Sequence, residues 1–318
     1  MDYFPSLLSI IATLFLLMVC GYICRKTKII DNSSSKGLSR LIISIGQPMM
    51  IIGALANAEY SKANLTIAWQ VTLISFVMHI LMSLAAYLIC LRMKKCDTTK
   101  IFEFTLIFSN CGFIGFPILD AILGDGKGSF MGAFYVIAFH LFLWTWGIII
   151  LARRREDIRM TPKKAIFNYG TIPCAIGVLL YLCKPLFELP DFFGKCFSYL
   201  GNLCTPISVL ITGALLATIS LSKMFTNVKL YLHSLIKLLV FPMAACLLAK
   251  LCGLNNTYIL VVTAMAGMPS AATVTMLAEL YDIEPGYASQ TVGITSLLST
   301  ATLPIVMLFA QWISSLSF

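Results

Sequence analysis

Long apolar runs separated by short polar segments make up almost the whole chain. Each run has roughly 18 or more residues, enough to cross a hydrocarbon core of about 30 Å as a helix. The polar segments between them are too short to hold a separate soluble domain. The pattern predicts an all-α, polytopic membrane protein with ten transmembrane helices, at about 5–23, 38–58, 66–91, 101–121, 128–151, 166–183, 195–219, 229–252, 256–280 and 286–314.

Composition and charge agree with this class. Of the 318 residues, 59% are hydrophobic and 12% are charged, whereas soluble domains carry about 25% charged residues. The net charge of +9 comes from basic residues that are unevenly placed, with 17 at alternate loops and 5 at the others. This positive-inside bias predicts that the 17-residue side, including the 153–164 loop, is cytoplasmic and that both termini lie outside the cytoplasmic membrane. The lipid bilayer is therefore the expected partner of the basic loops, and nucleic acid is not.

The cysteines give no sign of a metal or redox site. Eleven of them are scattered along the chain, mostly within the apolar runs, and none has paired CxxC spacing. The sequence also lacks the HExxH motif of zinc proteases. We therefore expect no cofactor, no bound metal and no catalytic residues.

The two halves of the chain resemble each other. Pro48 and Pro206 are 158 positions apart, as are Gly128 and Gly286. This spacing predicts a first five-helix repeat at 1–152, a linker at 153–165 and a second repeat at 166–318. Because five is odd, the second repeat is inverted in the membrane. Inverted repeats are typical of secondary transporters, whose sites lie where broken helices of the two halves meet.

The fourth and ninth spans contain the residues that break helices. Glycine lets the backbone turn, and proline cannot donate to the helical ladder. The freed backbone groups are costly in hydrocarbon unless they line a cavity or find a protein partner. Helix N-termini that follow such breaks attract anions, so we expect two facing ends to hold a carboxylate without an arginine. The predicted helix-break residues are Gly112, Gly115, Pro117, Gly267 and Pro269.

Two stretches carry a family resemblance that extends over essentially the whole chain. "SNCGFIGFPILDAILG" and "MPSAATVTMLAELYDIEPGYASQTVG" resemble the auxin efflux carrier family, which covers plant auxin exporters and bacterial permeases for malate, malonate and similar organic anions. The resemblance implies ten helices in two inverted repeats, with the fourth and ninth crossing at their breaks. It also implies a scaffold of helices 1, 2, 6 and 7, through which a homodimer can form, and a moving part of six helices. The large central loop of the plant exporters is absent, so their substrate is not carried over.

Asn110 matches the crossover Asn of this family. Its amide is suited to binding a carboxylate, and the alternative is that it only repairs its own broken helix. After Pro269 the family often has polar amides, whereas this chain has Ser270 and Thr273, which weakens the assignment there. The complete set of predicted substrate-binding residues is Asn110, Cys111, Gly112, Pro269, Ser270, Thr273, Gln47 and Thr205.

Ionisable residues inside spans are rare and usually functional. His79 and His140 lie near the middle of spans three and five. They are candidates for a proton relay, and the alternative that we favour is hydrogen-bonded packing between helices. Lys237 lies inside span eight, where we expect it to balance Glu103 or Asp120.

These observations predict a secondary transporter that moves a small organic anion, a mono- or dicarboxylate, by alternating access. The substrate is expected at the crossing of the broken helices. The alternatives are an anion channel and, further behind, an intramembrane enzyme.

Overall fold

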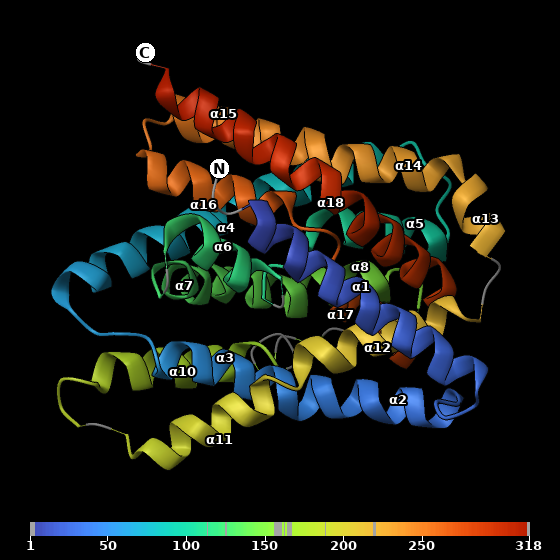
Figure 1. Ribbon diagram of the computed structural model, residues 1–318, viewed down its shortest axis with the longest axis horizontal. Helices are drawn as coiled ribbons and strands as arrows, with labels where there is room; N and C mark the ends of the chain where they lie inside the picture. Colours follow the sequence, from blue (N-terminus) through green and yellow to red (C-terminus); the bar gives the residue numbers. More distant parts are fainter. Residues whose placement is uncertain are drawn as a thin grey trace.

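The computed structural model describes residues 4–316 apart from 113, 125, 156–160, 162, 164–166, 188 and 219–220. The predicted linker at 153–165 thus falls largely outside the described residues. Helices dominate the described part of the chain, and they run in two groups through the molecule (Figure 1). Six helical stretches among the described residues are long and apolar enough to cross a membrane: Asn32–Ala56, Lys62–Cys90, Lys127–Ala152, Asp191–Leu216, Val228–Leu251 and Pro285–Ser315.

The first group, which we call the lower group from its place in Figure 1, is built around two helix contacts. In one, α1 packs along α12, and in the other, α3 packs on α10 and α11. The α1–α12 contact depends on Gly21 and Gly213, because a methyl group at either position would collide with the backbone of the opposite helix. The lower group comprises α1 (Phe4–Lys26), α2 (Asn32–Leu41), α3 (Gln47–Ala56), α10 (Thr171–Cys183), α11 (Asp191–Gly201) and α12 (Cys204–Leu216).

The second group, the upper group, surrounds two interrupted helices. Its largest contacts are α4 on α7, α15 on α16, α6 on α7 and α16 on α18. A short helix, α13 (Leu221–Thr226), precedes α14 at the edge of this group. The upper group comprises α4 (Lys62–Cys90), α5 (Asp97–Ile107), α6 (Gly115–Leu123), α7 (Lys127–Phe142), α8 (Ile148–Ala152), α14 (Val228–Leu235), α15 (Phe241–Leu251), α16 (Asn256–Gly267), α17 (Thr273–Leu280) and α18 (Pro285–Ser315).

Three π-helical turns lie inside long helices: η1 (Ile42–Gly46), η2 (Leu143–Gly147) and η3 (Ile236–Val240). Two of them end just before a proline, since Pro48 is the second residue of α3 and Pro242 the second of α15. A proline removes one bond of the helical ladder and crowds the preceding turn, and a wider turn accommodates both effects. The helices therefore continue through these prolines.

The outer surface is suited to lipid. Large apolar side chains are exposed on it, including Trp69 and Leu84 on α4 and Leu179 on α10. The interior is close-packed from both groups and holds the two interrupted helices. The middle of the molecule is therefore where the freed backbone groups of these helices must find partners.

Candidate functional site

The two interrupted helices cross through short extended segments. Between α5 and α6 the chain is non-helical near Ser109, and between α16 and α17 it is non-helical near Ser270. These two residues form an antiparallel bridge. The amide of Asn110 donates to the Pro269 carbonyl at 2.7 Å, and the amide of Ala271 donates to the Phe108 carbonyl at 2.9 Å. Each break therefore supplies backbone partners to the other, as a low-dielectric environment requires.

The predicted position of the first break needs a correction. The sequence placed it at 112–117, but α5 already ends at Ile107 and the crossing lies at 108–110. Pro117 is the third residue of α6, in the first turn, where a missing N–H interrupts no intrahelical bond. Pro117 therefore helps to begin the second half of the helix and does not form the crossing itself.

The glycines allow close packing around the crossing. A methyl group at Gly115 would lie 2.8 Å from the sulfur of Met265, and one at Gly112 would lie 3.2 Å from Cε of Met50. Gly267 is the last residue of α16. The two polypeptide segments thus approach each other and the lower group more closely than larger residues would permit.

Asn110 lies at the crossing and is 4% exposed. Its carbonyl accepts from the amides of Ile114 and Gly115, both at 3.2 Å. Its side-chain amide, in contrast, makes no hydrogen bond with any residue that the structure describes. The backbone of Asn110 therefore repairs the break, while the side chain keeps its donor and its acceptor for another partner.

Lys237, which lies in η3, also reaches the crossing. Its side chain is fully buried, and its Nζ donates to the Leu106 carbonyl at 2.9 Å and to Oγ of Ser109 at 2.6 Å. The ammonium thus sits at the C-terminal end of α5, where the helix dipole favours a positive charge.

The expected partners of Lys237 were wrong. Glu103 pairs with the guanidinium of Arg153, with distances of 2.5 and 2.9 Å. Asp120 accepts from the amide of Ser129 at 2.7 Å. The sequence led us to expect no arginine at the crossing, and the cation found there is a lysine. Spacing along span eight indicates the face on which Lys237 lies, but not which helix that face meets.

The second break uses its polar groups internally. Oγ of Ser270 donates to the Thr105 carbonyl at 3.1 Å, and the Ser270 amide donates to Oγ1 of Thr295 at 3.2 Å. Thr273, the first residue of α17, is buried, and its hydroxyl has no hydrogen-bond partner among the described residues. Cys111, which follows Asn110, is buried and its thiol donates to the Ser109 carbonyl at 3.4 Å.

Two predicted residues lie on the lower group. Gln47 is buried, and its Nε2 lies 3.4 Å from Nδ1 of His140 on α7. The Oε1 of Gln47 and the Nε2 of His140 have no partner in the described part of the chain. Thr205, the second residue of α12, is half-buried. Gln47 therefore meets the upper group directly, whereas no described contact brings Thr205 to the crossing.

The other two histidines are packed within the upper group. Nδ1 of His79 lies 2.8 Å from the Ser75 carbonyl, and its ring contacts three aromatic rings of α7. His233 is buried with Nε2 at 2.9 Å from Oγ1 of Thr105. His79 therefore packs between α4 and α7, and His233 packs against Thr105 of the interrupted helix α5.

A cavity of about 950 Å³ lies between the two groups. Its lining includes Met50 of α3, Phe116 of α6 and Tyr258 of α16. Glu59, in the loop after α3, and Lys127, the first residue of α7, also lie on its wall. Met50, which lines the cavity, also faces Gly112 next to the crossing. A ligand of the size of a small organic acid fits in this volume.

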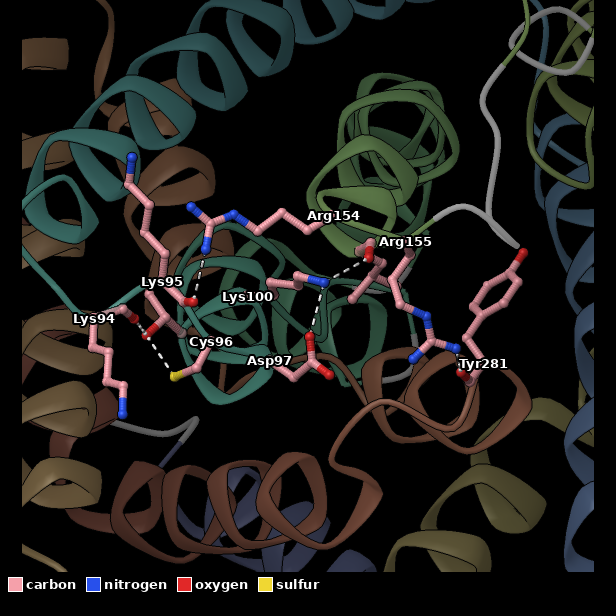
Figure 2. Close-up of polar contacts among 10 residues, drawn as sticks. Lys94, Lys95, Cys96, Asp97, Lys100, Arg154, Arg155 and Tyr281 are labelled. Carbon is pink, nitrogen blue, oxygen red and sulfur yellow. Dashed lines mark hydrogen bonds and ion pairs between the residues drawn. The ribbon is translucent and has the colours of Figure 1, made fainter.

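Away from the cavity, a polar contact joins the two groups at α2 and α17. Oγ of Ser39 on α2 donates to the buried Glu279 of α17 at 2.7 Å. Nearby, Arg155 donates to the Tyr281 carbonyl at 3.1 Å, and Lys100 pairs with Asp97 at 2.8 Å (Figure 2). The Ser39–Glu279 hydrogen bond joins the two groups here, and the other two contacts lie within the upper group.

Comparison with known proteins identifies the protein family. Residues 7–307 match the model of a family described as membrane transport protein, the auxin efflux carrier family. The chain belongs to this family. It is accordingly a multi-pass membrane protein and a membrane transporter.

The relatives of this membrane transport protein extend over nearly the whole chain. An uncharacterized transporter of Methanothermobacter thermautotrophicus is 23% identical over 298 residues, which cover 93% of this chain and 95% of that protein. The uncharacterized transporter YfdV of Escherichia coli K12 is 20% identical over 301 residues, with 91% and 94% covered. A solved structure, the sodium proton antiporter MjNhaP1 of Methanocaldococcus jannaschii at pH 8, has a TM-score of 0.58 at 14% identity, covering 98% of this chain and 96% of that one. At 14% identity, this similarity shows a shared fold and says nothing about a shared substrate.

Proposed function

We propose that this transporter moves a small organic anion, a mono- or dicarboxylate, by alternating access, and binds the carboxylate at the crossing. The observation that carries the proposal is the side chain of Asn110. It is nearly fully buried, and it has neither donor nor acceptor paired among the described residues. A bound carboxylate would give this amide a charged hydrogen-bond partner, an interaction worth about 1.5–3 kcal/mol.

The electrostatics of the crossing favour an anion. The N-termini of α6 and α17 begin within a few residues of Asn110 and Ser270, and such ends carry about half a positive charge each. The amino group of Lys237 lies at Ser109 and, when protonated, adds a positive charge there. Thr273, with its free hydroxyl at the start of α17, is a second candidate ligand, whereas Ser270 and Pro269 serve the crossing itself.

The two helix groups provide the parts for alternating access. In our proposal the lower group is the scaffold, through which a homodimer can form, and the upper group moves and carries the crossing. The cavity wall includes residues 57–59, Gly126 and Asn255, which lie in or next to connections that carry few basic residues and are expected outside. The end with Arg153, Arg155 and Lys100 is then expected to be cytoplasmic. The chain would thus be in an outward-facing state.

The inverted repeat gains support from the crossing. Each proposed half contains one interrupted helix, α5–α6 in the first and α16–α17 in the second, and their extended segments pair antiparallel. Oppositely directed halves place the two breaks at the same depth, as in transporters with midplane sites.

The fold likeness to a cation antiporter raises a second candidate, cation transport. A cation site at the crossing would need several oxygen ligands, usually with carboxylates. No group of three or more His, Cys, Asp or Glu side chains suited to a cation occurs in the described residues, and Lys237 brings a positive charge there instead. The local chemistry therefore favours an anion.

Flux measurements on purified protein in liposomes test the proposal. We would load vesicles with unlabelled acetate, lactate, benzoate, malonate or succinate and follow uptake of the labelled acid, with and without H⁺ and Na⁺ gradients. Saturable uptake that internal substrate accelerates supports a carrier. Non-saturating flux would indicate a channel, conversion of the acid would indicate an enzyme, and absence of carboxylate flux with Na⁺ flux present would contradict the proposal.

A further inference from the structure

Lys237 is an uncompensated charge in the interior of the membrane domain. Its side chain is 0% exposed, and both atoms that it contacts, the Leu106 carbonyl and Oγ of Ser109, are neutral. Lys100, the other buried lysine of the described residues, pairs with Asp97 near a loop. No carboxylate of the described residues lies within ion-pair distance of Lys237. Burial of a charge without an opposite charge is strongly unfavourable.

The ammonium also has unused bonding capacity. An ammonium has three N–H donors, and the two contacts use two of them. The third has no partner among the described residues. Ser109, which holds the ammonium, is followed directly by Asn110, whose side-chain amide is also unpaired. The amino group of Lys237 and the unpaired amide of Asn110 thus belong to, or contact, two consecutive residues, Ser109 and Asn110.

We propose that Lys237 is the counter-ion of the transported anion, so that the site selects a singly charged carboxylate. The inference rests on the proposed function and narrows its substrate class. One negative charge at the crossing neutralises Lys237, whereas a second carboxylate leaves a net negative charge buried. A dicarboxylate dianion therefore binds more weakly than a monoanion of the same shape.

This charge balance has a consequence for transport. With a monoanion bound, the crossing has no net charge, and its movement between the two sides does not depend on the membrane potential. Without substrate, the crossing carries the positive charge of Lys237, and its return does depend on the potential. Exchange of monoanions uses only the loaded form, whereas net uptake also requires the empty form to return.

The first test uses the unmodified protein in liposomes with an imposed K⁺ diffusion potential. A unit charge that crosses the full field changes the relative populations of the two states by about 50-fold per 100 mV. We expect exchange of a labelled monocarboxylate from the panel to change by less than about twofold over this range, because the loaded site is neutral, and net uptake to change by several times more. Potential-sensitive exchange would overturn the counter-ion role and leave the carrier function intact. Absence of any saturable carboxylate exchange would instead remove the proposed function.

Substrate charge provides the second test. Succinate and its monoamide, succinamate, have nearly the same shape and differ by one charge at neutral pH. As competitors of the labelled monocarboxylate, we expect succinamate to bind at least about tenfold more tightly than succinate, because an unpaired buried charge is costly. Equal or stronger competition by succinate, or a panel in which only dicarboxylates are exchanged, would overturn the inference.

Variants separate charge from structure. Lys237→Gln keeps a hydrogen-bond donor and removes the charge, and we expect affinity to fall by about 30-fold or more, as for truncated buried charge pairs. Its remaining exchange should become sensitive to potential. Lys237→Arg keeps the charge, and Ser109→Ala removes only a neutral partner, so both should retain potential-insensitive exchange. A Lys237→Gln protein that loses affinity but keeps potential-insensitive exchange would reduce Lys237 to a structural support.

Discussion

The two interrupted helices have similar backbones and different chemistry. Both leave the helix for a short extended segment, and each segment satisfies the backbone of the other. At the first break the side chain of Asn110 is unpaired and Lys237 stands close by. At the second break the hydroxyl and the amide of Ser270 are both bonded within the protein.

Their surroundings differ as well. The half-helix after the first break, α6, lines the cavity through Phe116. The half-helix after the second, α17, is buried against α2, where Glu279 accepts from Ser39. In our proposal the two breaks therefore divide their tasks: the first presents ligand-binding groups, and the second holds the crossing together.

The largest effect is expected when the binding break receives a negative charge. Asn110→Asp replaces an amide by a carboxylate at the proposed anion site. Juxtaposed like charges cost several kcal/mol, so substrate binding should weaken by more than about 100-fold at neutral pH. Calorimetric titration of the purified protein measures this, and thermal unfolding checks that the variant is folded. Retention of near-normal affinity would mean that the anion binds away from this break.

Labelling of native cysteines tests whether the two interrupted helices cross the membrane in opposite directions. Cys96 precedes α5 and Cys252 lies between α15 and α16, and both are exposed. A hydrogen bond from Thr99 lowers the pKa of the Cys96 thiol below its ordinary value, which favours the reactive thiolate. In proteins that keep one of the two, an impermeant maleimide should label Cys96 only from the cytoplasmic side and Cys252 only from outside. Labelling of both from one side would contradict the inverted arrangement.

A smaller effect is expected at the supporting break. Ser270→Ala removes one hydroxyl bond to Thr105, which is worth about 1 kcal/mol, and should lower the midpoint of thermal unfolding modestly. Because the hydroxyl serves the crossing, the Kd for substrate should stay within about threefold of the unmodified value. A tenfold or larger loss of affinity with unchanged stability would assign Ser270 to the binding site and remove the contrast between the two breaks.

Much of the fold was predictable because it depends on local patterns. Apolar runs indicated the membrane helices, and the clusters around Gly112 and Pro269 identified the two interrupted spans. The end of α5 was misplaced because glycine and proline indicate where α6 can begin. The residues at which α5 stops, "FSN" at 108–110, contain neither. Their extended conformation depends on pairing with the second break, far away in the sequence.

Contacts between distant helices account for what the sequence did not show. Lys237 and Ser109 are 128 residues apart, and no local pattern indicates that η3 faces the end of α5. Gln47 and His140, 93 residues apart, were each recognised as polar residues in apolar spans, but not as neighbours. The place of Asn110 at the break could be predicted because its motif lies in one short stretch, whereas its role in binding stays a prediction.

The central claim, that the Asn110 side chain binds the carboxylate, is tested most directly by comparing Asn110→Leu with the unmodified protein in calorimetric binding. Leucine is nearly isosteric and removes both donor and acceptor, while the backbone bonds to Pro269, Ile114 and Gly115 remain available. A buried hydrogen bond to a charged group is worth about 1.5–3 kcal/mol, which predicts a Kd about 10- to 150-fold higher. An unchanged Kd in a folded Asn110→Leu protein would contradict the account and place the binding site elsewhere.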